Sequence, residues 1–292
     1  MQSYPKISIV TATLNQASFI EETILSIIDQ QYPNLEYIII DGGSNDGTID
    51  IIKKYEHRLA YWISEKDRGL YDALNKGFQK ATGEIMSWLN SDDILHRKAL
   101  STIASVFMDF PIIEWLSGVP SQVDEMGRSI WVGVETPWNK YRYLNLDYKY
   151  IQQEGIFWRR SLWEKSGGYL STQYTLASDL ELWSRFFNYA HLYSLPGLVG
   201  CFRLRSGNQK SLEGGDKYHE EAISILKKMP ITAEEARIRK IKSSLSYRLL
   251  KSLNFQRLFY LLGYQKVEQI VDKTPSKLYF DRTSQHFVLG DQ

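Results

Sequence analysis

The chain has 292 residues, of which 43% are hydrophobic and 24% are charged, and its formal net charge is +1. This composition is ordinary for a soluble globular protein, and the chain is long enough to bury a sizeable core. The near-neutral charge gives no reason to expect nucleic acid as a partner. The single cysteine, Cys201, excludes an internal disulfide framework and a cysteine-based zinc site, which fits a reducing compartment.

The first residues run directly into a strand pattern, with no apolar signal core after a basic start. No uninterrupted apolar stretch approaches the length that spans a membrane. We therefore expect a cytoplasmic protein.

Strand and helix patterns alternate along the first hundred residues. Runs of β-branched residues predict strands at 6–11, 36–40, 60–64 and 85–89. Apolar residues at helical spacing predict helices at 18–28, 48–54 and 70–81. Ser18 has capping-box spacing to Glu21, and Thr48 is a candidate helix cap. The alternation predicts an α/β fold with a mostly parallel sheet and right-handed crossovers.

The apolar run at 85–89 ends in a polar turn and two adjacent acids, Asp92 and Asp93. Ligands of α/β sheets bind at the carboxyl ends of the strands. Two carboxylates there suit a Mg²⁺-like cation that also holds a phosphate, because such ions take one or two carboxylates plus substrate oxygens. The alternative is that one Asp caps the next helix and the other is solvated.

After residue 110 the pattern becomes less regular. We predict short strands at 115–116, 130–132, 156–158, 191–195 and 198–204, helices at 161–166 and 179–189, and a polar aromatic loop at 136–150. From 216 to about 272 the pattern predicts helices.

Within that helical part, the segment 237–257 contains no acid and interleaves arginines and lysines with leucines and phenylalanines. This pattern is typical of a basic amphipathic surface for anionic lipid headgroups. It is also typical of a helical cap whose solvent-facing side is basic, and both readings remain open.

Four blocks, in order, resemble the inverting family 2 glycosyltransferases of the GT-A fold. They are 8–15 (Ser-Ile-Val-Thr-Ala-Thr-Leu-Asn), 41–48 (Asp-Gly-Gly-Ser-Asn-Asp-Gly-Thr), 69–77 (Gly-Leu-Tyr-Asp-Ala-Leu-Asn-Lys-Gly) and 81–93, which ends in Leu-Asn-Ser-Asp-Asp. The resemblance spans about residues 5–210. It implies a Rossmann-like GT-A domain at 1–215, with a nucleotide half at about 1–110 and an acceptor half at about 111–215. A mainly helical extension would follow at 216–292.

The resemblance implies roles on the donor side. Thr11 would border the nucleotide, Asp41 would read the nucleobase edge, and Arg68 would contact the base or a phosphate. In the Ser-Asp-Asp variant of the family's Asp-x-Asp motif, Asp92 matches the ribose-side acid and Asp93 the metal-holding acid. The implied cofactor is Mg²⁺ or Mn²⁺, held by Asp93 with Asp92 beside it, and such an ion would neutralise a departing diphosphate.

An inverting enzyme also needs a base opposite the leaving group. The block 177–185 looks like the family's Glu-Asp block at a helix start, which implies Asp179 as the base, with Ser178 where the family often has Glu. Glu154 occupies the place of a family His-Gln pair and is a backup base or a sugar ligand. Trp158 and Trp183 are candidates for sugar stacking, although core packing is the favoured reading.

The block 201–211 resembles the one that closes over the diphosphate. It implies Arg203 and Arg205 as donor-binding cations, with Arg205 where the family often has a metal-binding His. The implied activity is metal-dependent transfer from a nucleotide sugar, in the UDP form, to a glycan or lipid-linked glycan of surface-polysaccharide assembly. Two alternatives remain: a nucleotide-sugar-binding pseudoenzyme, because of Ser178 and Arg205, and a sugar-phosphate nucleotidyltransferase, for which the first loop lacks a glycine-rich phosphate motif.

Overall fold

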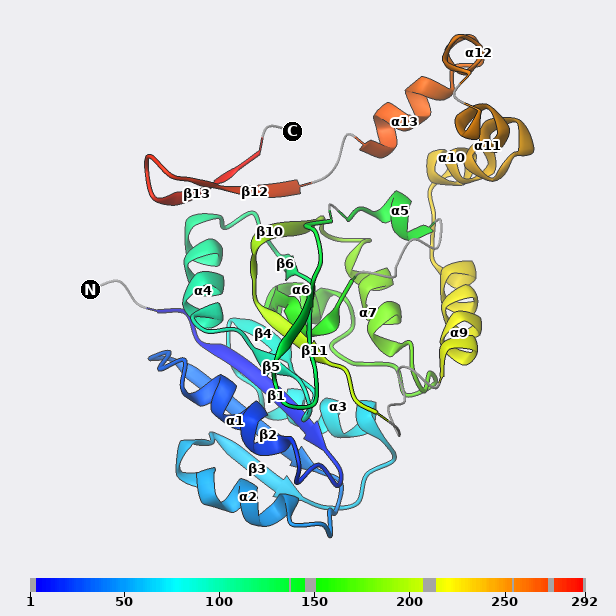
Figure 1. Cartoon of the computed structure of the whole chain (residues 1–292). Helices are drawn as coiled ribbons and strands as arrows, with labels where there is room; N and C mark the ends of the chain where they lie inside the picture. Colours follow the sequence, from blue (N-terminus) through cyan, green and yellow to red (C-terminus); the bar gives the residue numbers. More distant parts are fainter. Residues whose placement is uncertain are drawn as a thin grey trace.

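The computed structural model describes residues 4–136, 138–144, 151–206, 214–253, 255–272 and 276–290. The strands among these residues form a nine-stranded sheet in the order β13-β12-β10-β6-β9-β4-β1-β2-β3 and a four-stranded sheet in the order β5-β11-β7-β8. Figure 1 shows the large sheet at the centre of the molecule with helices around it.

The first half is a run of parallel strands with crossover helices. The strands are β1 (Ile7–Thr13), β2 (Leu35–Asp41), β3 (Tyr61–Ser64) and β4 (Ile85–Trp88), and the helices are α1 (Ile20–Ile28), α2 (Thr48–Tyr55), α3 (Leu70–Lys80) and α4 (Ala99–Asp109), with the short 3₁₀ turn η1 (Glu56–Arg58). β1 pairs in parallel with both β2 and β4, and all of its residues are buried. Strands that are covered on both faces need this continuous apolar sequence. The predicted mostly parallel α/β sheet is confirmed.

Alternate residues of β1 face two different hydrophobic cores. Val10 belongs to the core that α3 covers, and Ile9 belongs to the core that α1 and α4 cover. This follows from the two-residue period of a strand. Because both faces are packed, polar groups can meet a ligand only at the strand ends.

The second half adds antiparallel pairs. Its elements are β5 (Ile94–Leu95), β6 (Trp115–Val119), β7 (Ser121–Val123), β8 (Ser129–Val132), α5 (Lys140–Leu144), η2 (Gln153–Gly155), β9 (Ile156–Arg159), α6 (Arg160–Lys165), α7 (Ser178–Phe186), β10 (Leu192–Leu198) and β11 (Gly200–Arg203). β9 lies antiparallel between β4 and β6. β11 pairs with β5 and with β7, so it brings its end next to the Asp92-Asp93 turn. The predicted loop at 136–150 lies partly outside the described residues.

Tryptophans fill the core beneath this half of the sheet. The rings of Trp88 and Trp183 stack with centroids 5.6 Å apart, and Trp158 meets Trp183 edge to face at 5.9 Å. Trp158 and Trp183 are almost completely buried. Their assignment to the core, rather than to a sugar-stacking surface, is confirmed.

The C-terminal part is helical and then returns to the sheet. Its elements are α9 (Gly215–Lys228), α10 (Ala233–Ser243), α11 (Leu245–Ser252), α12 (Gln256–Leu261), α13 (Tyr264–Asp272), β12 (Ser276–Asp281) and β13 (His286–Leu289). β12 pairs in parallel with β10, which extends the central sheet. Residues of α9 also belong to the main core. The extension predicted from 216 is therefore joined to the domain at both of its ends, and Figure 1 shows α10–α13 standing off to one side.

Two predicted helix caps are not formed. Phe19 precedes α1, with no side-chain cap, and Thr48 is the first residue inside α2. The hydroxyl of Thr48 accepts a hydrogen bond from the backbone N–H of Gln16 instead, at 2.8 Å. Tertiary contacts between loops outcompeted the local capping pattern. In the described part of the chain, no helix is both long and apolar enough to cross a membrane.

Candidate active site

The loops after β1 and β2 lie against each other at the carboxyl edge of the sheet. The backbone N–H of Asn15 donates to Ser44 Oγ at 2.7 Å, and that of Asn45 donates to Asn15 Oδ1 at 3.0 Å. β1 and β2 are in register up to the pair Thr13 and Asp41. The two loops therefore form one rigid wall beside the strand ends.

Asp41 stabilises the loop after β2 through hydrogen bonds to its buried carboxylate. Its buried carboxylate accepts hydrogen bonds from the backbone N–H of Gly43 (3.0 Å), from the backbone N–H (2.9 Å) and hydroxyl of Ser44, and from Ser64 Oγ (2.6 Å). A carboxylate has about four lone-pair positions, so these donors occupy it. Contact with a nucleobase edge, as the resemblance implies, requires a hydroxyl such as that of Ser44 to turn away.

Thr11 does not line a ligand site in this structure. It is fully buried, and its hydroxyl accepts a hydrogen bond from the Tyr37 hydroxyl at 3.1 Å. The predicted contact with the nucleotide is corrected, because the strand carries Thr11 into the core. Thr13 stands two residues closer to the edge, and its Oγ1 is buried with no hydrogen-bond partner among the described residues. Thr13 is not among the predicted site residues, although its place at the end of the first strand was an available signal.

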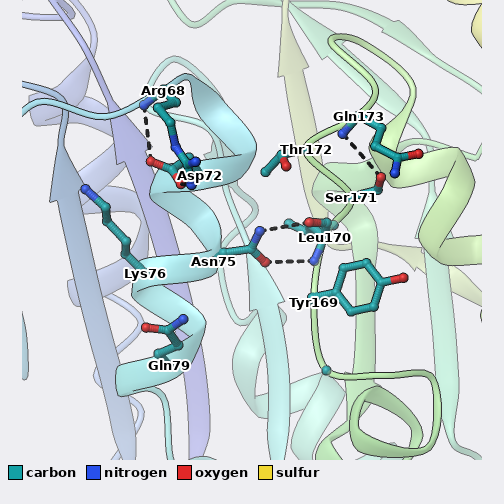
Figure 2. Close-up of a pocket in the computed structure, with 11 residues that line it drawn as sticks. Arg68, Asp72, Asn75, Lys76, Gln79, Tyr169, Leu170, Ser171, Thr172 and Gln173 are labelled. Atoms are coloured by element: carbon teal, nitrogen blue, oxygen red, sulfur yellow. Dashed lines mark hydrogen bonds and ion pairs between the residues drawn. The ribbon is translucent and has the colours of Figure 1, made fainter.

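Arg68 lies at one end of a polar pocket between α3 and the segment 168–173 (Figure 2). The pocket has a volume of about 390 Å³. The Arg68 side chain is 84% exposed and pairs with Asp72 at 2.6 Å. The side-chain amide of Asn75 holds the opposite wall through two hydrogen bonds to the backbone of Leu170, at 2.8 and 2.7 Å. Arg68 is thus free to reorient toward a ligand, since an exposed ion pair of this kind contributes little to stability.

Asp92 and Asp93 follow β4 in a tight turn at the centre of this edge. Asp93 is almost completely buried, and its carboxylate accepts hydrogen bonds from the backbone N–H of Arg203 (2.8 Å) and from Asn90 Nδ2 (3.1 Å). Asp92 is more accessible and forms an ion pair with Arg205, with Nη2 to Oδ2 at 2.8 Å. Burial raises the pKa of both carboxyls, most strongly that of Asp93, where the nearby charges of Glu154 and Asp92 add to it.

Arg203 is a structural residue. Its side chain is fully buried, and its guanidinium donates to the carbonyl oxygens of Asp92 (2.6 Å), Asp124 and Glu125 (3.0 Å each) and to Glu22 Oε2 (2.7 Å). A group that is committed to protein acceptors and hidden from solvent does not meet a donor phosphate. The predicted donor-binding role of Arg203 is therefore corrected to one of holding the Asp92-Asp93 turn.

Arg205 is placed differently, although it lies only two residues further on. Besides its ion pair with Asp92, it donates to Gln16 Oε1 at 3.3 Å and packs over the Phe19 ring, with Cζ 5.1 Å from the centroid. Its guanidinium thus sits where the first loop meets the aspartate turn. The rest of the predicted closing block, from 207 to 211, lies outside the described residues.

Glu154 is a buried acid next to Asp93. β11 approaches it so closely that a Cβ on Gly200 would lie 1.9 Å from the Glu154 carbonyl oxygen, which only glycine avoids. The charge of Glu154 raises the pKa of the Asp93 carboxyl, so ionisation of one of these buried acids opposes ionisation of the other. Burial raises the pKa of Glu154 to about 7, and the charges of Asp179 and Asp92 contribute to the rise.

Asp179 is half-buried in the first turn of α7. Burial raises its pKa to about 6, against the lowering effect of the helix N–H groups, and Oδ1 has no hydrogen-bond partner among the described residues. Its charge acts on Glu154, so Asp179 and the aspartate turn belong to one acidic cluster. Ser178 does not cap α7, because its hydroxyl donates to the carbonyl of Ser171 at 2.8 Å.

Glu221 on α9 supports this region and has no signal in the sequence. Its carboxylate accepts hydrogen bonds from the backbone N–H groups of Thr175, Leu176 and Ala177, each at 2.9 Å. These residues lead directly into α7. Glu221 therefore fixes the path of the chain that carries Asp179.

The oxygen donors at the aspartate turn fit a hard divalent cation that is shared with a ligand. Within the described ranges, no three His, Cys, Asp or Glu side chains converge as a complete metal cage. Mg²⁺ and Mn²⁺ need only one or two carboxylates when a diphosphate supplies further oxygens. Asp92 and Asp93 would supply the carboxylates, and the buried Asn90 Oδ1, which has no hydrogen-bond partner among the described residues, would offer a further oxygen.

Solved structures share this fold. *Staphylococcus aureus* TarS (residues 1–349), in complex with UDP-GlcNAc, matches 81% of this chain and 71% of its own, with a TM-score of 0.62 at 18% identity. The mannosyltransferase PcManGT from *Pyrobaculum calidifontis*, in complex with GDP-Man and Mn²⁺, matches 91% of this chain and 83% of its own, with a TM-score of 0.53 at 20% identity. The fold is therefore of the GT-A class.

Sequence comparison identifies the family. The family model described as glycosyl transferase family 2 matches residues 8–158. An uncharacterized glycosyltransferase of *Mycobacterium tuberculosis* is 30% identical over 209 residues, which are 69% of this chain and 74% of the relative. The putative teichuronic acid biosynthesis glycosyltransferase TuaG of *Bacillus subtilis* is 38% identical over 92 residues, 30% of this chain and 36% of TuaG. The chain belongs to glycosyl transferase family 2 and is a glycosyltransferase.

Proposed function

We propose that this protein transfers a sugar, with inversion at the anomeric carbon, from a nucleoside-diphosphate donor to a hydroxyl of a glycan or lipid-linked glycan. The observation that carries the proposal is the acidic cluster at the carboxyl edge of the sheet. It joins the aspartate turn, Glu154 and Asp179. The arrangement supplies oxygen ligands at one end and a carboxylate with a raised pKa at the other.

On the donor side, Asp92 and Asp93 would hold Mg²⁺ or Mn²⁺, which when bound offsets the negative charge of the leaving diphosphate. Arg205 lies beside Asp92, and its guanidinium is a cation of the right geometry for phosphate oxygens. Arg68, whose side chain is 84% exposed, would reorient to contact the base or a phosphate. Asp41 and Thr13 would border the nucleoside at the ends of β1 and β2.

On the acceptor side, Asp179 would take the proton of the attacking hydroxyl. A base works best when its pKa is near the working pH, and burial has moved the pKa of Asp179 to about 6. Its Oδ1 lacks a described protein donor, so it is able to accept a substrate hydrogen bond. Glu154 would act on the donor side, because it is buried next to Asp93 and its charge raises the pKa of that carboxyl.

The polar pocket of Figure 2 would receive the acceptor. Ser171 lines it, and the Ser171 carbonyl is bonded to Ser178, the neighbour of Asp179. Amide, hydroxyl and aromatic groups suit a sugar ring better than an apolar ligand. Substitution of Gln173 by Ala should raise the KM for the acceptor and leave donor hydrolysis unchanged.

The relatives support a role in cell-surface polysaccharide or glycolipid assembly, since TuaG is named for teichuronic acid biosynthesis. The TarS structure holds UDP-GlcNAc, and the mannosyltransferase structure holds GDP-Man with Mn²⁺. These ligands support a nucleotide-sugar donor and a divalent ion for this chain. We propose UDP as the nucleotide of the donor. We further infer that the reaction takes place in the cytoplasm, at the inner face of the membrane.

Donor hydrolysis by the purified full chain, with and without Mn²⁺, tests the proposal. We expect UDP release from a UDP-sugar that depends on Mn²⁺ and is lost in Asp93→Asn. The exposed Asp50→Asn on α2 is the matched control. Metal-dependent binding of the donor without any turnover or transfer would favour a pseudoenzyme instead, and pyrophosphate-dependent formation of a nucleotide sugar would favour the nucleotidyltransferase.

A further inference from the structure

Large apolar side chains are exposed along α11, α12 and the turn between them. Their exposed fractions range from 48% to 78%, and they are Leu245, Leu249, Leu253, Phe255, Leu258, Tyr260, Leu261 and Leu262. We call this set the apolar tip. Figure 1 shows α11 and α12 at the end of the helical arm that is farthest from β1 and β2.

The apolar tip remains exposed after the helices have formed their own core. Tyr247, on the inner side of α11, packs against Phe259 and Tyr264, with ring centroids 5.3 and 5.4 Å apart. Leu245, Leu249 and Leu253 recur every four residues and therefore share the opposite face of α11. Contiguous apolar surface that a fold leaves in water marks an interaction site.

The residues around the apolar tip are basic. The sequence contains no acid from 237 to 267, and Arg248, Lys251 and Arg257 are exposed among the leucines. Glu268 pairs with Lys251 at 2.7 Å and with Lys242 at 3.7 Å, which offsets part of that charge. Because the whole chain carries only +1, this positive charge is a local feature and not a general property.

We propose that the apolar tip docks on the surface of an anionic lipid bilayer. Leucines and aromatics would enter the boundary between headgroups and acyl chains, and Arg248 and Arg257 would meet anionic headgroups. A second copy of the chain is a poorer occupant, since two such tips would bring like charges together. The inference goes beyond the proposed transfer reaction and does not depend on it, because no residue of the tip belongs to the acidic cluster.

Vesicle flotation of the full chain tests this docking. We expect the protein to float with vesicles of phosphatidylcholine mixed with phosphatidylglycerol, and not with vesicles of phosphatidylcholine alone. Leu258→Ser and Leu261→Ser should each weaken the partition about tenfold, because each removes a side chain that the bilayer buries. Arg248→Gln and Arg257→Gln should each weaken it roughly fivefold.

Two matched controls keep the test specific. Ile112→Ser removes an apolar side chain that is 64% exposed elsewhere, and Lys53→Gln removes an exposed charge on α2. Both should float like the unchanged protein, and all variants should keep donor hydrolysis in solution. Equal flotation of all variants, binding that ignores lipid charge, or a dimer that Leu258→Ser dissociates without any flotation would each overturn the docking proposal.

Discussion

Glu154 and Asp93 are two buried acids, and the charge of Glu154 raises the pKa of the Asp93 carboxyl. They come from distant parts of the sequence. β11 lies against the Glu154 backbone at Gly200, and its last residue, Arg203, donates a backbone hydrogen bond to Asp93. This neighbourhood ties Glu154 to the donor side. The charge of Asp179 in turn raises the pKa of Glu154.

This arrangement separates the two candidate bases. Asp179→Asn should lower kcat for transfer about a hundredfold or more, since it removes the general base while keeping the shape. Glu154→Gln should keep kcat within about tenfold, because the amide keeps the shape of the side chain and Asp179 remains as the base. Steady-state transfer kinetics of the two variants decides the matter, and the reverse ranking would make Glu154 the base.

The pH dependence should report Asp179. Its folded pKa is raised to about 6, and only the ionised form accepts a proton. Therefore kcat/KM should be level above pH 7 and fall about tenfold per pH unit below pH 6. A profile measured with the wild-type chain that stays flat down to pH 5 would contradict this assignment.

Glu221 should act as a positioning residue for Asp179. In Glu221→Gln, the backbone bonds to Thr175, Leu176 and Ala177 lose their charged acceptor, which costs about 1–3 kcal/mol of stability. The Glu221 charge also contributes to the raised pKa of Asp179. Its removal should move the acidic limb of kcat/KM to lower pH. A stability loss with an unmoved limb would show a purely structural role.

Variants of Arg203 and Arg205 should distinguish a structural role from a role in donor binding. Arg203→Met leaves buried acceptors without their donor and should lower the melting temperature strongly, since such losses cost several kcal/mol. Arg205→Gln should lower the melting temperature by less than Arg203→Met, because Asp92, with which Arg205 forms its ion pair, can take up a proton, but it should raise the KM for the donor about tenfold. Thermal unfolding together with donor kinetics tests both, and a large stability loss in Arg205→Gln would place it in the scaffold as well.

Much of the fold was predictable because its strands carry their own signal. The β-branched runs of β1 and β2 and the apolar run before Asp92 can only be buried strands. The short strands β5 and β7 have too few residues to show a two-residue period. β12 was not predicted either, because it joins the large sheet by pairing with β10, which lies far away in sequence. Helix α4 was also missed, although its residues are largely apolar.

The site was predictable in chemistry more than in detail. The motif order predicts that Asp92, Asp93 and Asp179 act together, and the charge of Asp179 reaches Glu154 beside the aspartate turn. Their roles stay predictions. The motif order assigned Thr11 and Arg203 to the ligand, whereas tertiary packing buries both. The contacts of Glu221 and Asn90 could not be predicted from the local sequence. Residue type and spacing predict which strand a side chain follows. Only the tertiary packing decides which polar atoms are left free to bind a ligand.

The central claim is that the aspartate turn binds a nucleoside diphosphate together with a divalent ion. The most direct measurement is the thermal shift that UDP and GDP produce in the full chain, with and without Mn²⁺, in the wild type and in Asp92→Asn and Asp93→Asn. We predict stabilisation by one nucleotide that requires Mn²⁺ and disappears in both variants. An equal shift without Mn²⁺, or an unchanged shift in both variants, would contradict the account.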